Sequence, residues 1–334
     1  MPIADWLKGE MREKAQDYII APLGERHGAP RRAPVEIDSA YVSLSVKAAR
    51  IVDIRRWTSK FHGCINSRAT FLHEAQGNVE HQTVLAPPEL KELDPAHLDR
   101  IVSIDKVLLG PFPYRGQLGL TIALFSVKSA DLAGPYLDLL TSLADTAGVS
   151  FLAAAKAYIE PLRKGADLLF GSANASQLEI GFDRDFTALE AGYYLAMRAP
   201  KDSVQLDTLR IDPNDYRLLD QQGRPFGSYP YFVLAVETGQ RRADWMLIPD
   251  LKTTWDEMKK AFVAAQYNDA GNLLGQFERE CRVSPDLVPA DVQRLVKKAR
   301  DTFGSQQAGS FGAGRGAREE GIRFPEVGDL DLYG

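Results

Sequence analysis

The sequence predicts an α+β protein in which antiparallel, sandwich-like β-sheets are flanked by helices, with an N-terminal amphipathic helix and a disordered C-terminal tail. Three observations predict this class. Apolar residues alternate with a period of two from residue 35, helical periodicity dominates 131–170 and 249–303, and glycine becomes dense after Phe303.

The composition is that of a globular protein. Of 334 residues, 45% are hydrophobic and 25% are charged, so the chain can bury a core and is too apolar for general disorder. The net charge of −5 excludes wholesale electrostatic attraction to nucleic acid or anionic lipid, so any such binding must be local.

The cysteines and the apolar runs indicate the cellular compartment. Cys64 and Cys281 cannot build a disulfide framework, and charges interrupt the N-terminus where a signal peptide needs an apolar run. The longer apolar runs, such as 118–127, fall short of the roughly 20 residues that cross a bilayer. We therefore expect a cytoplasmic protein with no transmembrane segment.

Residues 1–24 form the first predicted domain, an amphipathic arm helix. Between residues 3 and 20, apolar side chains that include Trp6, Met11 and Tyr18 return to one face at helical spacing. Residues 24–34 are a polar linker punctuated by proline. Because this linker separates the helix from the core, we expect an arm that docks on the protein's own core or on a partner.

The predicted α+β core, residues 35–303, has two halves that each run from strands to helices. In the first half, 35–170, Val42, Leu44 and Val46 alternate with serines, which indicates a half-buried strand. The further elements predicted in this half are strands at 62–73, 79–85, 104–110 and 117–128 and helices within 131–170.

The second half, 176–303, repeats this order. Its predicted strands are 177–182, 190–198, 204–211, 216–219 and 229–238, and its predicted helices are 249–265, 268–281 and 289–303. Pro289 marks the start of the last helix, since proline is favoured in the first turn.

Residues 304–334 form the predicted tail. This segment is rich in glycine and poor in aliphatic residues, so it cannot bury enough apolar surface to offset the entropy of ordering. Its last stretch carries spaced hydrophobic residues among acidic ones, which is typical of a short linear motif that orders on a partner. The alternative is a tail that only keeps the protein soluble. The candidate contact residues of this motif are Phe324, Leu330, Leu332 and Tyr333.

The stretch 61–81 holds three of the five histidines and one of the two cysteines, so it is a candidate metal site. A two-residue turn at Gly77-Asn78 would place Glu74 opposite His81 on paired strands. His62 and Cys64 share a strand face, but a closed zinc site needs four ligands. We therefore interpret the stretch as two structural strands and expect no metal.

Other candidate catalytic groups are weaker. Asp183 and Asp185 share a face of an extended segment and could hold a divalent ion, but such pairs usually solvate a hairpin tip. The neighbouring Glu278 and Glu280 should raise the pKa of the Cys281 thiol, which argues against a nucleophile. No phosphate-binding loop or dinucleotide fingerprint is present, so we expect no cofactor.

Basic residues gather between positions 47 and 60 with aromatic residues among them. Arginine binds phosphate through two parallel hydrogen bonds and aromatic faces stack on bases, so the cluster could grip an anion or a nucleic-acid strand. The alternative is a solvated strand edge guarded by charge. The candidate residues are Lys47, Arg50, Arg55, Arg56, Trp57 and Lys60.

These observations favour a non-enzymatic scaffold or adaptor that binds another protein, or itself, through its arm and tail. A ligand-sensing or nucleic-acid-binding module based on the basic cluster is the alternative. A metal-assisted hydrolase that uses Asp183 and Asp185, or the pair His62 and Cys64, is the third interpretation.

Overall fold

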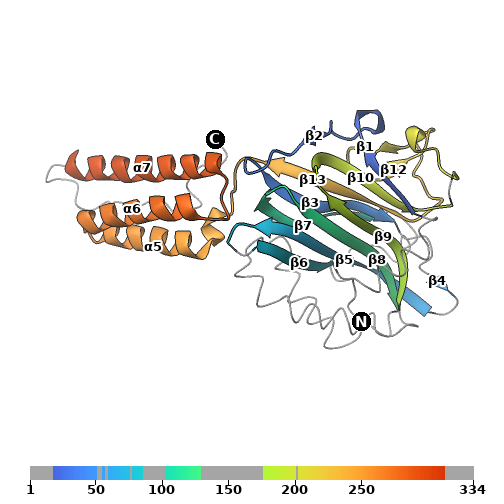
Figure 1. Ribbon diagram of the computed structural model, residues 1–334, viewed down its shortest axis with the longest axis horizontal. Helices are drawn as coiled ribbons and strands as arrows, with labels where there is room; N and C mark the ends of the chain where they lie inside the picture. Colours follow the sequence, from blue (N-terminus) through green and yellow to red (C-terminus); the bar gives the residue numbers. More distant parts are fainter. Residues whose placement is uncertain are drawn as a thin grey trace. The chain divides into compact units, whose positions relative to one another are not determined.

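The computed structural model describes residues 18–50, 55–56, 59–75, 77–85, 102–128, 176–200 and 202–312 (Figure 1). The chain divides into two compact units. We call residues 1–37 and 42–238 the sheet unit, and residues 38–41 and 239–334 the helical unit. The predicted α+β class is confirmed, because the described elements comprise antiparallel sheets and three α-helices.

Among the described strands, one sheet has six members in the order β1-β10-β13-β3-β7, with β2 also paired to β10. Val42, Leu44 and Val46 of strand β3 are fully buried as predicted, but the predicted half-buried character of the strand is wrong, since Ser45 and Lys47 on its other face are buried too. The strands of this sheet are β1 (Tyr18–Leu23), β2 (Ala33–Pro34), β3 (Tyr41–Arg50), β7 (Val102–Pro113), β10 (Glu190–Arg198) and β13 (Tyr231–Gly239).

The second sheet has five described strands in the order β4-β5-β8-β9, with β6 also paired to β5. Leu118, Leu120 and Ile122 of β8 are all buried, as expected for a central strand. The strands of this sheet are β4 (Arg55–Arg56), β5 (Ser59–His73), β6 (Gly77–Leu85), β8 (Leu118–Lys128) and β9 (Ser176–Phe186).

Aromatic side chains join the two sheets face to face. Phe71 of β5 lies 4.4 Å from Phe112 of β7 between ring centroids, and Phe182 of β9 lies 6.4 Å from Phe232 of β13. These contacts at different points of the sheets show that both bury one face in a common core.

The other face of the six-stranded sheet is covered by the segment between β10 and β13. Leu209, Ile211 and Leu218 of this segment pack with Leu195 of β10 and Val233 of β13. The predicted strands 204–211 and 216–219 are wrong for most of their length. The segment instead contains the 3₁₀ turn η5 (Leu206–Thr208) and a short two-stranded pair of β11 (Arg210–Ile211) and β12 (Leu218–Leu219).

The predicted N-terminal helix is contradicted at residues 18–20, and the part of it before residue 18 lies outside the described residues. Residues 18–23 are strand β1, which pairs antiparallel with β10 from Tyr18 opposite Arg198 to Leu23 opposite Tyr193. Tyr18, Ile19 and Ile20 form an aromatic and β-branched run that satisfies its backbone groups in this ladder. The 3₁₀ turn η2 (Glu25–His27) follows within the predicted linker.

The helical unit contains the three predicted C-terminal helices. They are α5 (Pro249–Val263), α6 (Tyr267–Val283) and α7 (Pro289–Gly312), preceded by the 3₁₀ turn η6 (Trp245–Leu247). Trp245, Trp255 and Phe277 form an aromatic cluster with ring centroids 5.4–5.6 Å apart. All three are buried, so the unit has a core of its own.

Helix α7 continues nine residues beyond its predicted end at 303, so the predicted tail is wrong for residues 304–312. Adding residues to an existing helix costs far less than nucleating one, and this offsets the poor helix propensity of the glycines. Residues 313–334 lie outside the described residues.

The two predicted halves do not match the pairing of the strands. β8 from the first half pairs with β9 from the second, and β3 neighbours β13. The predicted helices within 131–170 lie outside the described residues. No described helix is long and apolar enough to cross a membrane.

Candidate functional site

The stretch 61–81 forms the β5–β6 hairpin, but with a different register from the predicted one. β5 ends at His73 and β6 begins at Gly77, so residues 74–76 make the connection and Ala69 lies opposite His81. The predicted pairing of Glu74 with His81 is therefore wrong. Glu74 accepts a hydrogen bond of 3.0 Å from Arg115 instead.

His81 is a buried structural residue. Its Nε2 lies 3.0 Å from Thr83 Oγ1, and the Thr83 hydroxyl donates a bond of 2.6 Å to the carbonyl oxygen of Leu108 in β7. Because that hydroxyl proton is committed to Leu108, His81 Nε2 must carry the proton and donate. Burial lowers the pKa of His81 to about 4, which keeps the ring neutral near pH 7.

The candidate metal ligands are distributed along strands. His62 and Cys64 lie on β5, opposite Val127 and Phe125 of β8. Asp183 and Asp185 lie exposed on β9, opposite Thr121 and Gly119, and Thr121 donates a bond of 2.6 Å to Asp183. Within the part of the chain that the structure describes, no three or more histidine, cysteine, aspartate or glutamate side chains are grouped to hold a metal ion.

Cys281 is buried near the end of α6. Burial raises the pKa of its thiol to about 12, and the charges of Glu280, Asp291 and Glu278 add to the effect. The predicted direction of this shift is confirmed. A thiol with this pKa is protonated at neutral pH and is a poor nucleophile.

Lys47 forms a group that we call the Lys47 cluster, with Asp105, Glu237 and Tyr216. Its ammonium lies 2.8 Å from Asp105 and 3.1 Å from Glu237, and 5.4 Å from the centroid of the Tyr216 ring. Burial alone would lower the pKa of Lys47, but the hydrogen bonds that its ammonium donates to the two carboxylates outweigh burial and raise the pKa above its ordinary value. Asp105 and Tyr216 both have positive φ, so two strained residues converge on this lysine.

The other members of the predicted basic cluster lie at separate places. Arg50 follows Lys47 on β3 and donates a bond of 3.0 Å to the carbonyl oxygen of Gly227. Arg55 and Arg56 form β4, where Arg55 lies opposite Lys60 of β5. The structure thus divides the cluster between both sheets, and Trp57 lies outside the described residues.

The predicted partner-binding residues fall mostly outside the described residues. Tyr18 is the exception, since it begins β1. Those outside the described part are Trp6, Met11, Phe324, Leu330, Leu332 and Tyr333.

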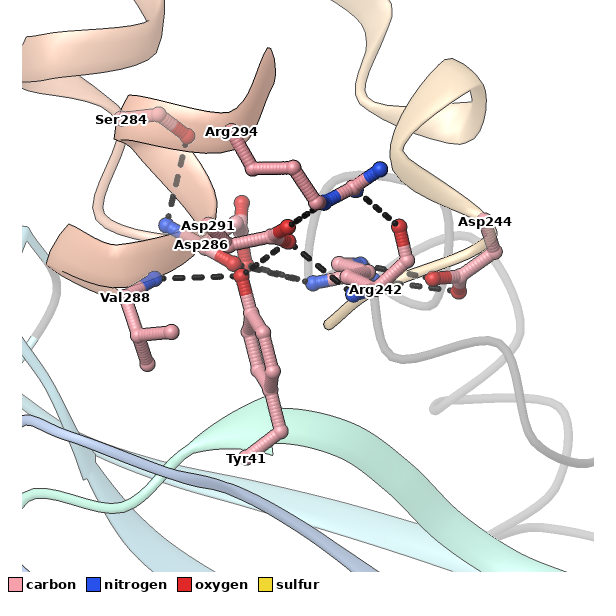
Figure 2. Close-up of polar contacts among 8 residues, drawn as sticks. All are labelled: Tyr41, Arg242, Asp244, Ser284, Asp286, Val288, Asp291 and Arg294. Atoms are coloured by element: carbon pink, nitrogen blue, oxygen red, sulfur yellow. Dashed lines mark hydrogen bonds and ion pairs between the residues drawn. The ribbon is translucent and has the colours of Figure 1, made fainter. Parts of the chain in front are cut away.

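The most extensive polar arrangement lies in the helical unit, and no motif in the sequence indicated it (Figure 2). We call it the Tyr41 network; it contains Tyr41, Arg242, Asp244, Ser284, Asp286, Val288, Asp291 and Arg294. Its centre is Asp291, in the first turn of α7, which is fully buried. Asp291 accepts bonds of 3.0 Å from the Tyr41 hydroxyl, 3.0 Å from the Arg242 backbone N–H and 2.7 Å from Arg294 Nε.

Tyr41 and Arg242 complete the network. The Tyr41 oxygen accepts a bond of 3.1 Å from the backbone N–H of Val288, the residue before α7, while its proton goes to Asp291. Burial, followed by the Asp291 charge, raises the pKa of Tyr41 above its usual value, so the phenol stays protonated. The fully buried Arg242 guanidinium binds both oxygens of Asp244 and the carbonyl oxygen of Asp286.

The network therefore caps α7 with a side chain from a distant part of the sequence. Asp291 also places negative charge at the positive end of the helix dipole. The donors and acceptors named here are paired with one another, which is typical of a structural lock.

No protein-family model, no curated protein and no solved structure matches this chain.

Proposed function

We propose that the protein is a non-enzymatic scaffold or adaptor that binds another protein, or a second copy of itself, through residues 1–17 and 313–334. Spaced apolar side chains in a polar segment can order on a partner surface. The proposed contact residues are Trp6, Met11, Phe324, Leu330, Leu332 and Tyr333. We place this role in the cytoplasm, in keeping with the cysteine content.

The observation that supports this proposal is the attachment of the two segments. Residues 1–17 continue directly into β1, an end strand in the order of the six-stranded sheet. Residues 313–334 follow α7, which belongs to the helical unit. The two candidate binding segments therefore adjoin different units in sequence, and two linked binding segments would allow bivalent engagement.

The positions of the reactive side chains are consistent with this proposal. Lys47 is neutralised by two carboxylates, and the fully buried Arg242 by Asp244. Cys281 is a buried, protonated thiol. Each of these groups has a structural role where it lies.

Truncation at the boundaries of the described elements tests the proposal. Deleting residues 1–17 leaves β1 intact, and deleting residues 313–334 leaves α7 intact. We expect the full chain, used as bait in an extract of its source cells or measured alone by light scattering, to recover a partner or self-associate. Each deletion should weaken this association, and the double deletion should abolish it.

Two side-chain variants separate binding from folding. Replacing Trp6 and Met11 by serine should weaken association as the first deletion does, whereas replacing the exposed Leu247 and Val263 by serine should leave it unchanged. Association that survives in the folded double deletion would contradict the proposal.

A further inference from the structure

Strand β1 is an end strand of the six-stranded sheet, beside β10 (Figure 1). In an antiparallel sheet, successive residues direct their backbone N–H and C=O groups to opposite sides. The Arg198 N–H donates to the carbonyl oxygen of Pro230 on the side of β13, so the preceding residue, Met197, faces β1. Since Met197 lies opposite Ile19, the residues of β1 that bond β10 are Ile19, Ala21 and Leu23.

The other residues of β1 direct their backbone away from β10. They are Tyr18, Ile20 and Pro22, and no described strand pairs with them on that side. The position of Pro22 supports this assignment, because proline has no N–H and is tolerated where a strand has no neighbour. The outer edge thus offers the N–H groups of Tyr18 and Ile20 and the C=O groups of all three residues. Ile20 is half-buried and Pro22 is exposed, so this edge reaches the surface.

Strand β1 also differs from the other end strands in charge. Its sequence, YIIAPL, has no charged residue. Charged side chains on an end strand hinder pairing with another chain, and every other described end strand of more than two residues carries them. At β1, two copies of the same strand can pair without like charges meeting. The charged residues on the other end strands include Asp105 and Lys106 on β7, Glu80 on β6, and Asp183 and Asp185 on β9.

We infer that the partner in the proposed function is a second copy of this chain, and that the two copies pair antiparallel along β1 with Ile20 opposite Ile20. In this register the two Ile20 residues exchange both of their backbone hydrogen bonds, and each Tyr18 N–H meets the C=O of the other copy's Pro22. Every outward N–H group of β1 then has an acceptor. A twofold axis relates the strands, so each copy uses its β1 edge once and the assembly closes as a dimer.

The inference rests on the proposed function, because two paired β1 strands form only a small interface. The six residues of β1 extend about 20 Å, whereas a specific interface buries on the order of 1,000 Å² or more. Residues 1–17 supply the remaining contact area. Because the strands run antiparallel, each of these segments starts beside the second copy's Leu23 and η2, where the proposed contacts of Trp6 and Met11 are made.

Disulfide cross-linking tests the register. Ile19 would lie opposite the other copy's Ala21 in a non-hydrogen-bonded pair, with Cα atoms about 4.5 Å apart, whereas the two Ile19 residues would be about 8 Å apart, beyond disulfide reach. The experiment uses a Cys64→Ser background, in which the remaining Cys281 is buried. A mixture of Ile19→Cys and Ala21→Cys chains should cross-link about tenfold faster under mild oxidation than either variant alone.

Non-reducing gel electrophoresis with one chain tagged measures the mixed dimer. Ile37→Cys mixed with Ile19→Cys is the control, because Ile37 is 57% exposed but lies outside β1, and this mixture should show no such acceleration.

A charge exchange tests the pairing without a covalent bond. Ile20→Lys and Ile20→Glu each place like charges opposite one another, so each should weaken self-association about tenfold in analytical ultracentrifugation. Mixing the two variants should restore association, because opposite charges then meet. Leu247→Lys and Leu247→Glu, at an exposed position of the helical unit, are the matched controls and should leave association unchanged alone and mixed.

Three results would overturn the inference. They are a natural chain that stays monomeric, a mixture that cross-links no faster than its components, and self-association that the Ile20 substitutions leave unchanged. If the terminal deletions still abolish association in the last case, the proposed function stands and another surface joins the copies. Conversely, register-specific cross-linking that is undiminished in the double deletion would support the β1 pairing and contradict the role proposed for the terminal segments.

Discussion

At the scale of single residues, the buried polar side chains show how the sheets are held in register. His81 and Thr83 on β6 reach the backbone of β7 through one chain of hydrogen bonds, His81 to Thr83 to Leu108. A buried polar group without its partner costs about 1–3 kcal/mol, so this chain favours one arrangement of the two sheets.

His81 should make stability depend on pH. Its folded pKa of about 4 lies below the unfolded value of 6.5, so between these values the unfolded chain binds more protons. Its contribution is therefore fully present above pH 6.5 and is lost progressively down to about pH 4. The free energy of unfolding of the natural chain should therefore fall between pH 7.5 and pH 5. In His81→Gln this fall should be smaller by roughly 2 kcal/mol, as measured by urea unfolding at the two pH values.

Thr83→Val is the control for this prediction. It removes the hydroxyl bonds but leaves the histidine buried, so it should lower stability at every pH while keeping the natural pH dependence. The same pH dependence in His81→Gln as in the natural chain would show that His81 does not titrate in this way.

Two glycines with positive φ should differ sharply in their tolerance of alanine. A Cβ on Gly110 would lie 2.5 Å from the carbonyl oxygen of Val42 and 2.7 Å from the Cα of Ser43, and this backbone cannot move aside cheaply. At Gly77 nothing lies within 4 Å of the added atom. We expect Gly77→Ala to cost about 1–2 kcal/mol from φ alone and Gly110→Ala several times more, measured by chemical denaturation. Equal costs would contradict the close approach of β3 and β7.

At the scale of elements, periodicity located most strands and helices but not their partners. β3, β5, β8, β10 and β13 lie close to where apolar patterns in the sequence predicted strands, because a sheet buries apolar side chains on one or both of its faces. Tyr18, Ile19 and Ile20 suit a helix face and a strand equally, so only pairing with β10 decides between them.

Candidate contacts were harder to predict than elements. The position of Lys128 opposite Phe61, and the bonds from Tyr41 to α7, join residues far apart in sequence with no motif between them. The direction of the Cys281 pKa shift agrees with the acidic neighbours Glu278 and Glu280 on the same helix, but burial, its largest cause, follows only from the fold. The predicted β5–β6 register was wrong because Gly77 belongs to strand β6 and not to the turn.

Tyr41→Phe tests the cap of α7. The change removes a donor to the buried Asp291 and an acceptor for the Val288 N–H. We expect a loss of roughly 2–4 kcal/mol, since both buried groups lose a partner. Chemical unfolding followed by far-ultraviolet circular dichroism measures this loss in the free energy of unfolding.

Tyr229→Phe is the control, since Tyr229 is only half-buried. It should change stability by less than about 0.5 kcal/mol, because water can replace a partner there. Equal effects of the two changes would contradict a special role for Tyr41.

At the scale of the whole molecule, the two units have separate cores, so they should respond separately to core mutations. Phe277 lies in the aromatic cluster of the helical unit and Phe182 in the core between the sheets. Each change to alanine should cost about 3–5 kcal/mol in its own unit.

Calorimetry should show that Phe277→Ala lowers the midpoint temperature of one unfolding transition and Phe182→Ala that of the other. Tryptophan fluorescence should follow the first, because Trp245 and Trp255 contact Phe277. A single transition lowered equally by both changes would show that the units unfold together.

The Tyr41 network also determines when the helical unit can be completed during synthesis. Tyr41 leaves the ribosome 250 residues before Asp291, and the sheet strands are made in between. Translation proceeds at about 5–20 residues per second, so the early tyrosine waits on the order of ten seconds or more for its acceptor. A fragment cloned as residues 239–334 would lack Tyr41, so its Val288 N–H and its Asp291 carboxylate would each lose one hydrogen-bond partner.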